Sequence, residues 1–79
     1  MPPTVAEVRK AVLPHTPRVL RGTGCQQLSF LVKKGEICAQ LLSHGQEFLV
    51  VLDSTALTKT GCQLASYITL QVLKKRGIA

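Results

Sequence analysis

Apolar and polar residues alternate with the two-residue period of a β-strand through the middle of the chain. Three segments show this pattern: residues 26–33, 36–42 and 46–52. One parity of these segments is apolar throughout and contains Leu28, Phe30, Val32, Ile37, Ala39, Leu41, Phe48, Val50 and Leu52. The turn signals Lys34-Gly35 and Ser43-His44-Gly45 are short, so neighbouring strands must run antiparallel. The pattern predicts a three-stranded antiparallel β-meander.

A helical pattern precedes the strands. Thr4 and Glu7 have the Thr-x-x-Glu spacing of a capping box, in which each side chain bonds to the backbone of the other residue. The apolar residues that follow fall on one helical face and are Val5, Val8 and Val12. Pro14 cannot continue the hydrogen-bond ladder, so the predicted helix is short and ends before it.

The remaining segments complete the predicted order of elements. Residues 15–24 are interpreted as irregular, because proline and glycine interrupt them, with Arg18–Arg21 as a candidate short edge strand. A longer helix is predicted over residues 62–76 and ends at Gly77, with an inner face of Leu64, Ala65, Ile68 and Val72. The expected fold class is α+β: a three-stranded antiparallel β-meander with a short N-terminal helix and a long C-terminal helix (α-β-β-β-α). It forms one small domain over residues 1–79.

The second parity of the strands is also apolar. It contributes Leu31, Cys38, Leu42, Leu49 and Val51, which is too much apolar surface for open solvent. Either the N-terminal helix covers this face or a second copy of the chain does. Because that helix is short and offers three valines, we expect a homodimer at micromolar concentration.

Positive charge is the compositional feature that changes this picture most. Ten Lys/Arg residues against four Asp/Glu residues give a formal net charge of +6. The cations gather at predicted turns and helix ends, where a nucleic-acid backbone can reach them, although a solvated surface would also place them there. The candidate nucleic-acid-binding residues are Arg9, Lys10, Arg18, Arg21, Lys33, Lys34, Lys74, Lys75 and Arg76. No exposed aromatic platform is predicted, which argues against recognition of single strands by stacking.

The cysteines and histidines do not form a pattern typical of a catalytic or metal site. Cys25, Cys38 and Cys62 are widely spaced, whereas structural zinc sites bring thiolates in close pairs. Nucleophilic catalysis needs a base beside the nucleophile and a group that orients the base, and His15 and His44 lie in predicted loops. We therefore predict no enzyme activity, no metal and no cofactor.

Residues 28–79 resemble a small domain family of unassigned function. Its members are appended to the C-terminal end of some GIY-YIG nucleases and some restriction-modification proteins. The resemblance lies in a strand that leads into a glycine, a second strand with a small residue, a third strand before a polar segment, and a closing helix; here these are residues 30–35, Ala39, residues 47–56 and residues 67–78. Asp53 departs from the pattern, which prefers glycine there. The resemblance implies an accessory, nucleic-acid-associated module without catalysis, and it assigns no site residues.

The order of elements is also similar to that of the double-stranded RNA-binding domain. That family places a lysine cluster at the start of its last helix. Here that position has only Lys59, and the lysines Lys74 and Lys75 lie at the end of the helix. The similarity therefore concerns the fold and not the chemistry.

The sequence favours a non-enzymatic accessory or regulatory module that binds nucleic acid through its basic surface, with DNA favoured over RNA. The alternative is a protein-interaction module, an inhibitor or adaptor, that uses the apolar sheet face; a redox or metal protein that uses the three cysteines is a third hypothesis. No apolar run approaches the ~18 residues of a membrane-spanning helix, and no secretory signal pattern is present. A cytoplasmic or nucleoid-associated location without a membrane partner is expected.

Overall fold

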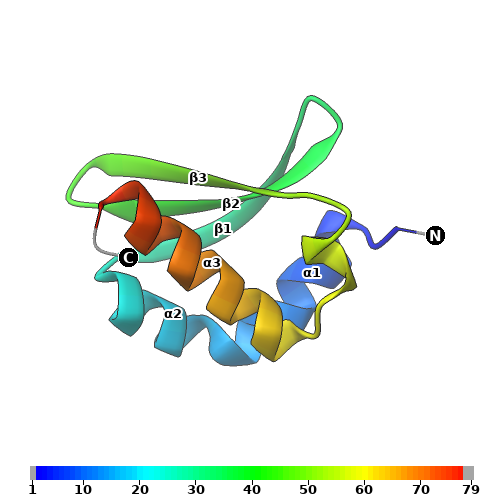
Figure 1. Ribbon diagram of the computed structural model, residues 1–79, viewed down its shortest axis with the longest axis horizontal. Coiled ribbons are helices and arrows are strands. Elements are labelled where there is room, and N and C mark those ends of the chain that lie inside the picture. The colour runs from blue at the N-terminus through cyan, green and yellow to red at the C-terminus, as the bar shows by residue number, and fades with distance from the viewer. Residues whose placement is uncertain (1, 78–79) are drawn as a thin grey trace.

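The computed structural model describes residues 2–77 and has two layers, a sheet and a group of helices (Figure 1). The sheet contains three antiparallel strands in the order β1 (Gln27–Lys33), β2 (Glu36–Ser43) and β3 (Gln46–Leu52). Ile78 and Ala79, the last two residues of the stretch that resembles the appended domains, lie outside the described residues. The predicted meander is confirmed, with strand bounds within one residue of those expected.

The two hairpin turns explain why the register is so well defined. Lys34 and Gly35 connect β1 to β2, and both have positive φ angles, of 53° and 79°. His44 and Gly45 connect β2 to β3 with φ angles of 50° and 81°. Two-residue turns with this backbone match the right-handed twist of the strands they join. They fix the pairing so that Phe30 faces Ala39 and Ala39 faces Val50.

The helical layer contains α1 (Val5–Val12), α2 (Thr16–Thr23) and α3 (Gly61–Lys75), with short 3₁₀ turns at Leu13–His15 (η1) and Ala56–Thr58 (η2). The predicted capping box of α1 is confirmed: the Glu7 N–H donates to Thr4 Oγ1 at 3.2 Å, and the Thr4 N–H donates to Glu7 Oε1 at 2.9 Å. The predicted C-terminal helix is also confirmed. It begins one residue earlier than expected, because Thr60 and Gln63 form a second capping box.

Helix α2 corrects the expectation that residues 15–24 are irregular and that Arg18–Arg21 form an edge strand. Pro17 lies in the first turn of the helix, where no backbone N–H is needed, and Gly24 ends the helix in a left-handed conformation with φ of 71°. Pro17 and Gly24 therefore mark the two ends of the helix, and Gly22 lies within it. Val19 and Thr23 are the buried side chains of α2.

The core lies between the helices and one parity of the strands. Phe30 and Phe48 are buried there, as the alternation predicts, together with the inner face of α3 formed by Leu64, Ala65, Ile68 and Val72. Val8 and Val12 of α1 join the same cluster. Helix α1 therefore shares the core with α3, on the same side of the sheet.

The other parity of the strands forms the open face, defined by Leu31, Cys38, Leu42, Leu49 and Val51. Figure 1 shows α1, α2 and α3 together on the opposite side of the sheet. The alternative in which the N-terminal helix covers the open face is therefore wrong. Val51 is 46% exposed and Leu49 is half-buried, whereas Cys38 is shielded by its cross-strand neighbours Leu31 and Val51. No helix within residues 2–77 covers this apolar surface.

Candidate nucleic-acid interface

Helices α2 and α3 lie side by side and run in the same direction. Near their first turns, Arg18 Nη2 lies 3.5 Å from the backbone oxygen of Cys62. Near their last turns, the Arg76 guanidinium donates a hydrogen bond to the Thr23 carbonyl oxygen. Close packing between the helices depends on Gly22, because a Cβ there would lie 3.1 Å from Thr69 Cγ2. The last turns of both helices therefore lie at the same end of the molecule (Figure 1).

These two helices carry the basic group, defined as Arg18, Arg21, Lys74 and Lys75. All four side chains are exposed, and neither α2 nor α3 contains an aspartate or glutamate. Arg21, Lys74 and Lys75 lie in last turns, where their charge also complements the negative end of the helix dipole. The α2–α3 pair therefore presents charge of a single sign, which is what a polyanion requires.

A shallow groove of about 320 Å³ runs between the two helices. It is lined by Arg18, Gly22, Ser66, Thr69, Leu70 and Leu73. Gly22, Ser66 and Thr69 have small side chains, whereas Leu70 and Leu73 give the groove an apolar wall. Sequence reasoning missed this α2–α3 groove because it did not predict α2; Pro17 and Gly24, at the two ends of the helix, were the signals available.

Arg76 differs from the other predicted cations because it points into the protein. Besides the bond to Thr23, its Nη2 lies 3.8 Å from Cys25 Sγ, and its guanidinium stacks 4.8 Å from the centroid of the Phe48 ring. These contacts tie the end of α3 to α2 and to the sheet. Binding of a phosphate by Arg76 would require it to leave them.

The remaining predicted residues lie elsewhere. Lys33 and Lys34 are exposed at the β1–β2 hairpin. Strand β1 begins beside the end of α2, and its seven residues at ~3.3 Å each place Lys33 about 20 Å from that end. Arg9 and Lys10 are exposed on α1, in the helical layer. The nine candidate residues therefore form separate groups, of which the basic group is the one built on two packed helices.

The three thiols are distributed over different elements. Cys25 follows α2, Cys38 lies on β2, and Cys62 is exposed in the first turn of α3, 3.5 Å from Arg18 Nη2. Within residues 2–77, no three His, Cys, Asp or Glu side chains are placed to hold a metal ion. In the same part of the chain, no helix has the length and apolar character needed to cross a membrane.

Comparisons with protein-family models, curated proteins and solved structures give no match to this chain. The resemblance to the appended nuclease domains and to the double-stranded RNA-binding domain therefore stays a prediction. At the start of the last helix, where the latter family carries its lysine cluster, Lys59 Nζ lies 5.9 Å from the centroid of the Tyr67 ring.

Proposed function

We propose that this chain is a non-enzymatic accessory module that binds duplex DNA through the basic group on α2 and α3. The observation that carries the proposal is the exposure of four cations on two packed helices that contain no carboxylate. Such a surface attracts phosphates without reading the bases, and each contact releases counterions. Binding is therefore weak to moderate, independent of sequence and strongly salt-dependent. It would act in the cytoplasm or on the nucleoid.

DNA rather than RNA is the proposed ligand, because the domain family that the chain resembles is appended to DNA nucleases. Single strands are a poor fit: Phe30 and Phe48 are buried, and the half-buried Tyr67 is the remaining aromatic residue of the chain. A regulatory or accessory role follows if the bound DNA is handed to, or protected from, an enzyme. An RNA duplex of the same length is the matched competitor.

The test replaces the two lysines at the end of α3 by glutamine. Lys74→Gln with Lys75→Gln lowers affinity for a labelled duplex of about 20 base pairs on the order of tenfold at ~50 mM salt. It also lowers the slope of log affinity against log salt by about 2, because two phosphate contacts are lost. Fluorescence anisotropy at several salt concentrations measures both quantities. Arg76 is left unchanged, because its substitution would disturb packing.

The matched control is Lys33→Gln with Lys34→Gln, which removes the same charge from the hairpin. We expect a clearly smaller loss of affinity, since these lysines lie far from the basic group. Equal losses from both pairs would show that net charge alone drives binding. Unchanged binding by the Lys74/Lys75 variant would rule out this interface, and tighter binding of the RNA duplex would reverse the choice of ligand.

We also propose that the open face associates with a second copy of the chain, as a protein-interaction surface. Its uncovered leucines and valine are the supporting observation. The charged residues of this parity are Lys33, Glu36 and Glu47, so two copies of a +6 protein can meet here with little repulsion. Three strands of seven or eight residues form a sheet face with a projected area of about 330 Å². A stable complex buries ~800 Å² of accessible surface per partner, which is well above this area. The dimer is therefore weak and concentration-dependent.

Sedimentation at about 100 µM tests this association. Leu49→Arg places a charge in the open face and should give a monomer, while Leu13→Arg is the control, because Leu13 is 63% exposed on the helical side. Dimerisation by the wild type and the Leu13 variant, but not by the Leu49 variant, would support the proposal. A monomeric wild type at this concentration would refute it.

A further inference from the structure

The α2–α3 groove has an apolar wall that contact with DNA leaves unexplained. Leu70 is 43% exposed there, and Leu73, one turn further along α3, is half-buried. A phosphate backbone gains nothing from an exposed leucine, because apolar surface is removed from water only by an apolar partner. The groove therefore suits a ligand that carries apolar groups as well as negative charge.

The spacing of the groove residues on α3 is that of a helix-packing seam. They recur at i, i+3, i+4 and i+7 and form one stripe along two turns: Ser66, Thr69, Leu70 and Leu73. None of them belongs to the buried face of α3, which packs in the core. Arg18 and Gly22 of α2, one turn apart, line the other side of the groove. A third helix can therefore lie in this groove in contact with both α2 and α3.

The charge beside the groove is of one sign. Arg18 lines the groove, the other cations of the basic group are exposed on the same two helices, and neither helix contains a carboxylate. A second copy of this +6 chain would be repelled here, whereas an acidic helix is attracted. Because α2 and α3 end together, an antiparallel partner helix places its first turn, where carboxylates are favoured, beside Lys74 and Lys75.

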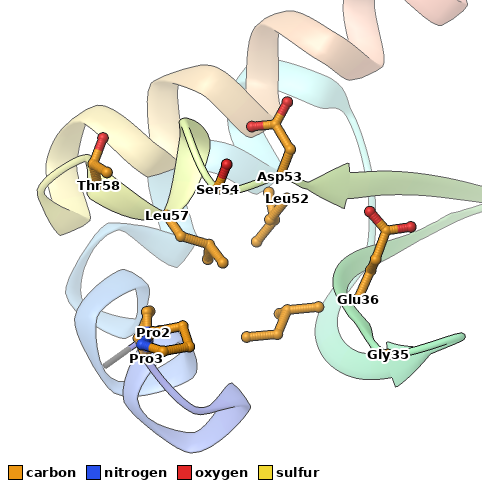
Figure 2. A pocket seen from close by; sticks show the side chains of 10 residues that line it. Pro2, Pro3, Gly35, Glu36, Leu52, Asp53, Ser54, Leu57 and Thr58 are labelled. Atoms are coloured by element: carbon orange, nitrogen blue, oxygen red, sulfur yellow. The ribbon is translucent and has the colours of Figure 1, made fainter.

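A larger hollow elsewhere in the molecule lacks this combination of charge and apolar wall. It has a volume of about 690 Å³ and lies between the residues before α1, the β1–β2 hairpin, the end of β3 and η2. Figure 2 shows Pro3 and Leu57 beside this space, whereas the carboxylates of Glu36 and Asp53 point away from it. No charged group among its described lining residues is therefore aimed at a ligand.

We infer that the α2–α3 groove binds an acidic amphipathic helix of a partner protein, antiparallel to α3. The apolar residues of that helix pack on Leu70 and Leu73, and its carboxylates pair with Arg18 and with the cations of the last turns. The helix and duplex DNA share one surface, so the partner displaces bound DNA. This competition rests on the proposed function, whereas the binding of the helix does not.

Fluorescence anisotropy with a labelled peptide tests the inference. The probe acetyl-SEELEALLEELLAA-amide, when helical, has a leucine stripe flanked by glutamates and is about as long as α3. One control peptide has glutamine in place of every glutamate, and a second keeps the composition but distributes the leucines around the helix. We expect the probe to bind with an affinity of about 10–100 µM at ~50 mM salt, and both controls to bind at least about tenfold more weakly.

The variant Leu70→Gln separates binding of the helix from binding of DNA. It removes apolar surface from the groove and keeps a good helix former at an exposed position, so the fold is retained. Affinity for the probe should fall about fivefold, while affinity for the DNA duplex changes less than about twofold. Leu13→Gln, at a leucine that is 63% exposed and does not line the groove, is the matched control and should leave both affinities unchanged.

Three results would overturn the inference whatever the result with DNA: no binding of the probe at about 1 mM, equal binding of the probe and either control peptide, or an unchanged affinity in Leu70→Gln. Tighter binding of phosphatidylglycerol vesicles than of the probe would assign the groove to a membrane surface and also overturn it. If the probe binds as expected and duplex DNA does not bind, the proposed function fails and this inference stands.

Discussion

The helical side and the open face of one sheet are both apolar, yet they are buried to different extents. Leu41 has no exposed surface beneath the helices, whereas the next residue, Leu42, is half-buried on the open face. The helices pack on one another as well as on the sheet: Gly61 of α3 lies against Ala11 of α1, and Gly22 of α2 lies against Thr69. A helical layer held together in this way covers one side only. Apolar content alone therefore does not decide which face of a sheet becomes core.

The two sides also differ in charge. The three helices contain one carboxylate, Glu7, and carry the exposed cations Arg9, Lys10, Arg18, Arg21, Lys74 and Lys75. The open-face parity of the strands has Lys33 against Glu36 and Glu47. A polyanion is therefore attracted to the helical side, and a second copy of the chain meets least repulsion at the sheet.

Truncation of neighbouring leucines should give the largest contrast between the two sides. Leu41→Ala creates a cavity in the core and should lower the free energy of unfolding by about 3 kcal/mol. Leu42→Ala removes a half-buried side chain and should cost about 1 kcal/mol. Urea denaturation at about 1 µM protein keeps self-association out of the measurement. Equal losses would mean that the open face is as well packed as the core.

A substitution at the start of α3 tests whether the helices hold together as a layer. In Gly61→Ala the new methyl group would overlap the Ala11 backbone carbonyl, so α1 and α3 must separate. We expect a loss of about 2 kcal/mol, which outweighs the gain in helix propensity of up to about 1 kcal/mol. Ser66→Ala, at an exposed position of α3, has the propensity gain without the overlap and should be neutral or slightly stabilising. Thermal unfolding of both variants measures the difference.

Arg76 allows packing and charge to be separated on the helical side. Arg76→Lys keeps the charge but loses the planar stacking on Phe48 and the forked contact with Thr23 and Cys25. The free energy of unfolding should fall by about 1 kcal/mol, while DNA affinity changes less than about twofold. Titration of a folded sample with duplex DNA, beside a denaturation curve, gives both numbers. A large loss of affinity with unchanged stability would place Arg76 in the interface instead.

The smallest expected effect is on the pKa of Glu7, the one carboxylate of α1, α2 and α3. The hydrogen bonds from the backbone N–H and hydroxyl of Thr4 lower the pKa of Glu7 below its ordinary value of 4.5. The capping box therefore contributes its full stability above about pH 4.5, and this contribution is lost as the pH falls through the lower folded-state pKa. An NMR titration of the Glu7 carboxyl should show the lowered midpoint. In Thr4→Ala the midpoint should rise only part of the way to the ordinary value, because the hydroxyl is lost and the backbone N–H of residue 4 remains.

Local signals explain how much of the fold could be predicted. The strands, both hairpin turns and the capping box of α1 depend on residues a few positions apart, such as Lys34 with Gly35 or Thr4 with Glu7. Helix α1 also has only two buried side chains, but its capping box marks its start; α2 was missed because it has no side-chain cap and contains or adjoins a proline and two glycines. Of the candidate site, the cations were visible in the sequence. Their grouping and the inward position of Arg76 were not, because both depend on contacts between α2 and α3.

The sequence by itself determined the strands, their register and the sign of the charge on α1 and α3, because hydrogen-bonded turns and side-chain alternation act over short distances. The tertiary structure alone decided that all three helices lie on one side of the sheet and that α2 and α3 end together. Alternation placed Phe30 and Phe48 in the core, but the second parity is apolar too, so alternation could not decide which face the N-terminal helix covers. That choice was made by packing between α1, α2 and α3, through close approaches at Gly22 and Gly61 to residues far away in the chain.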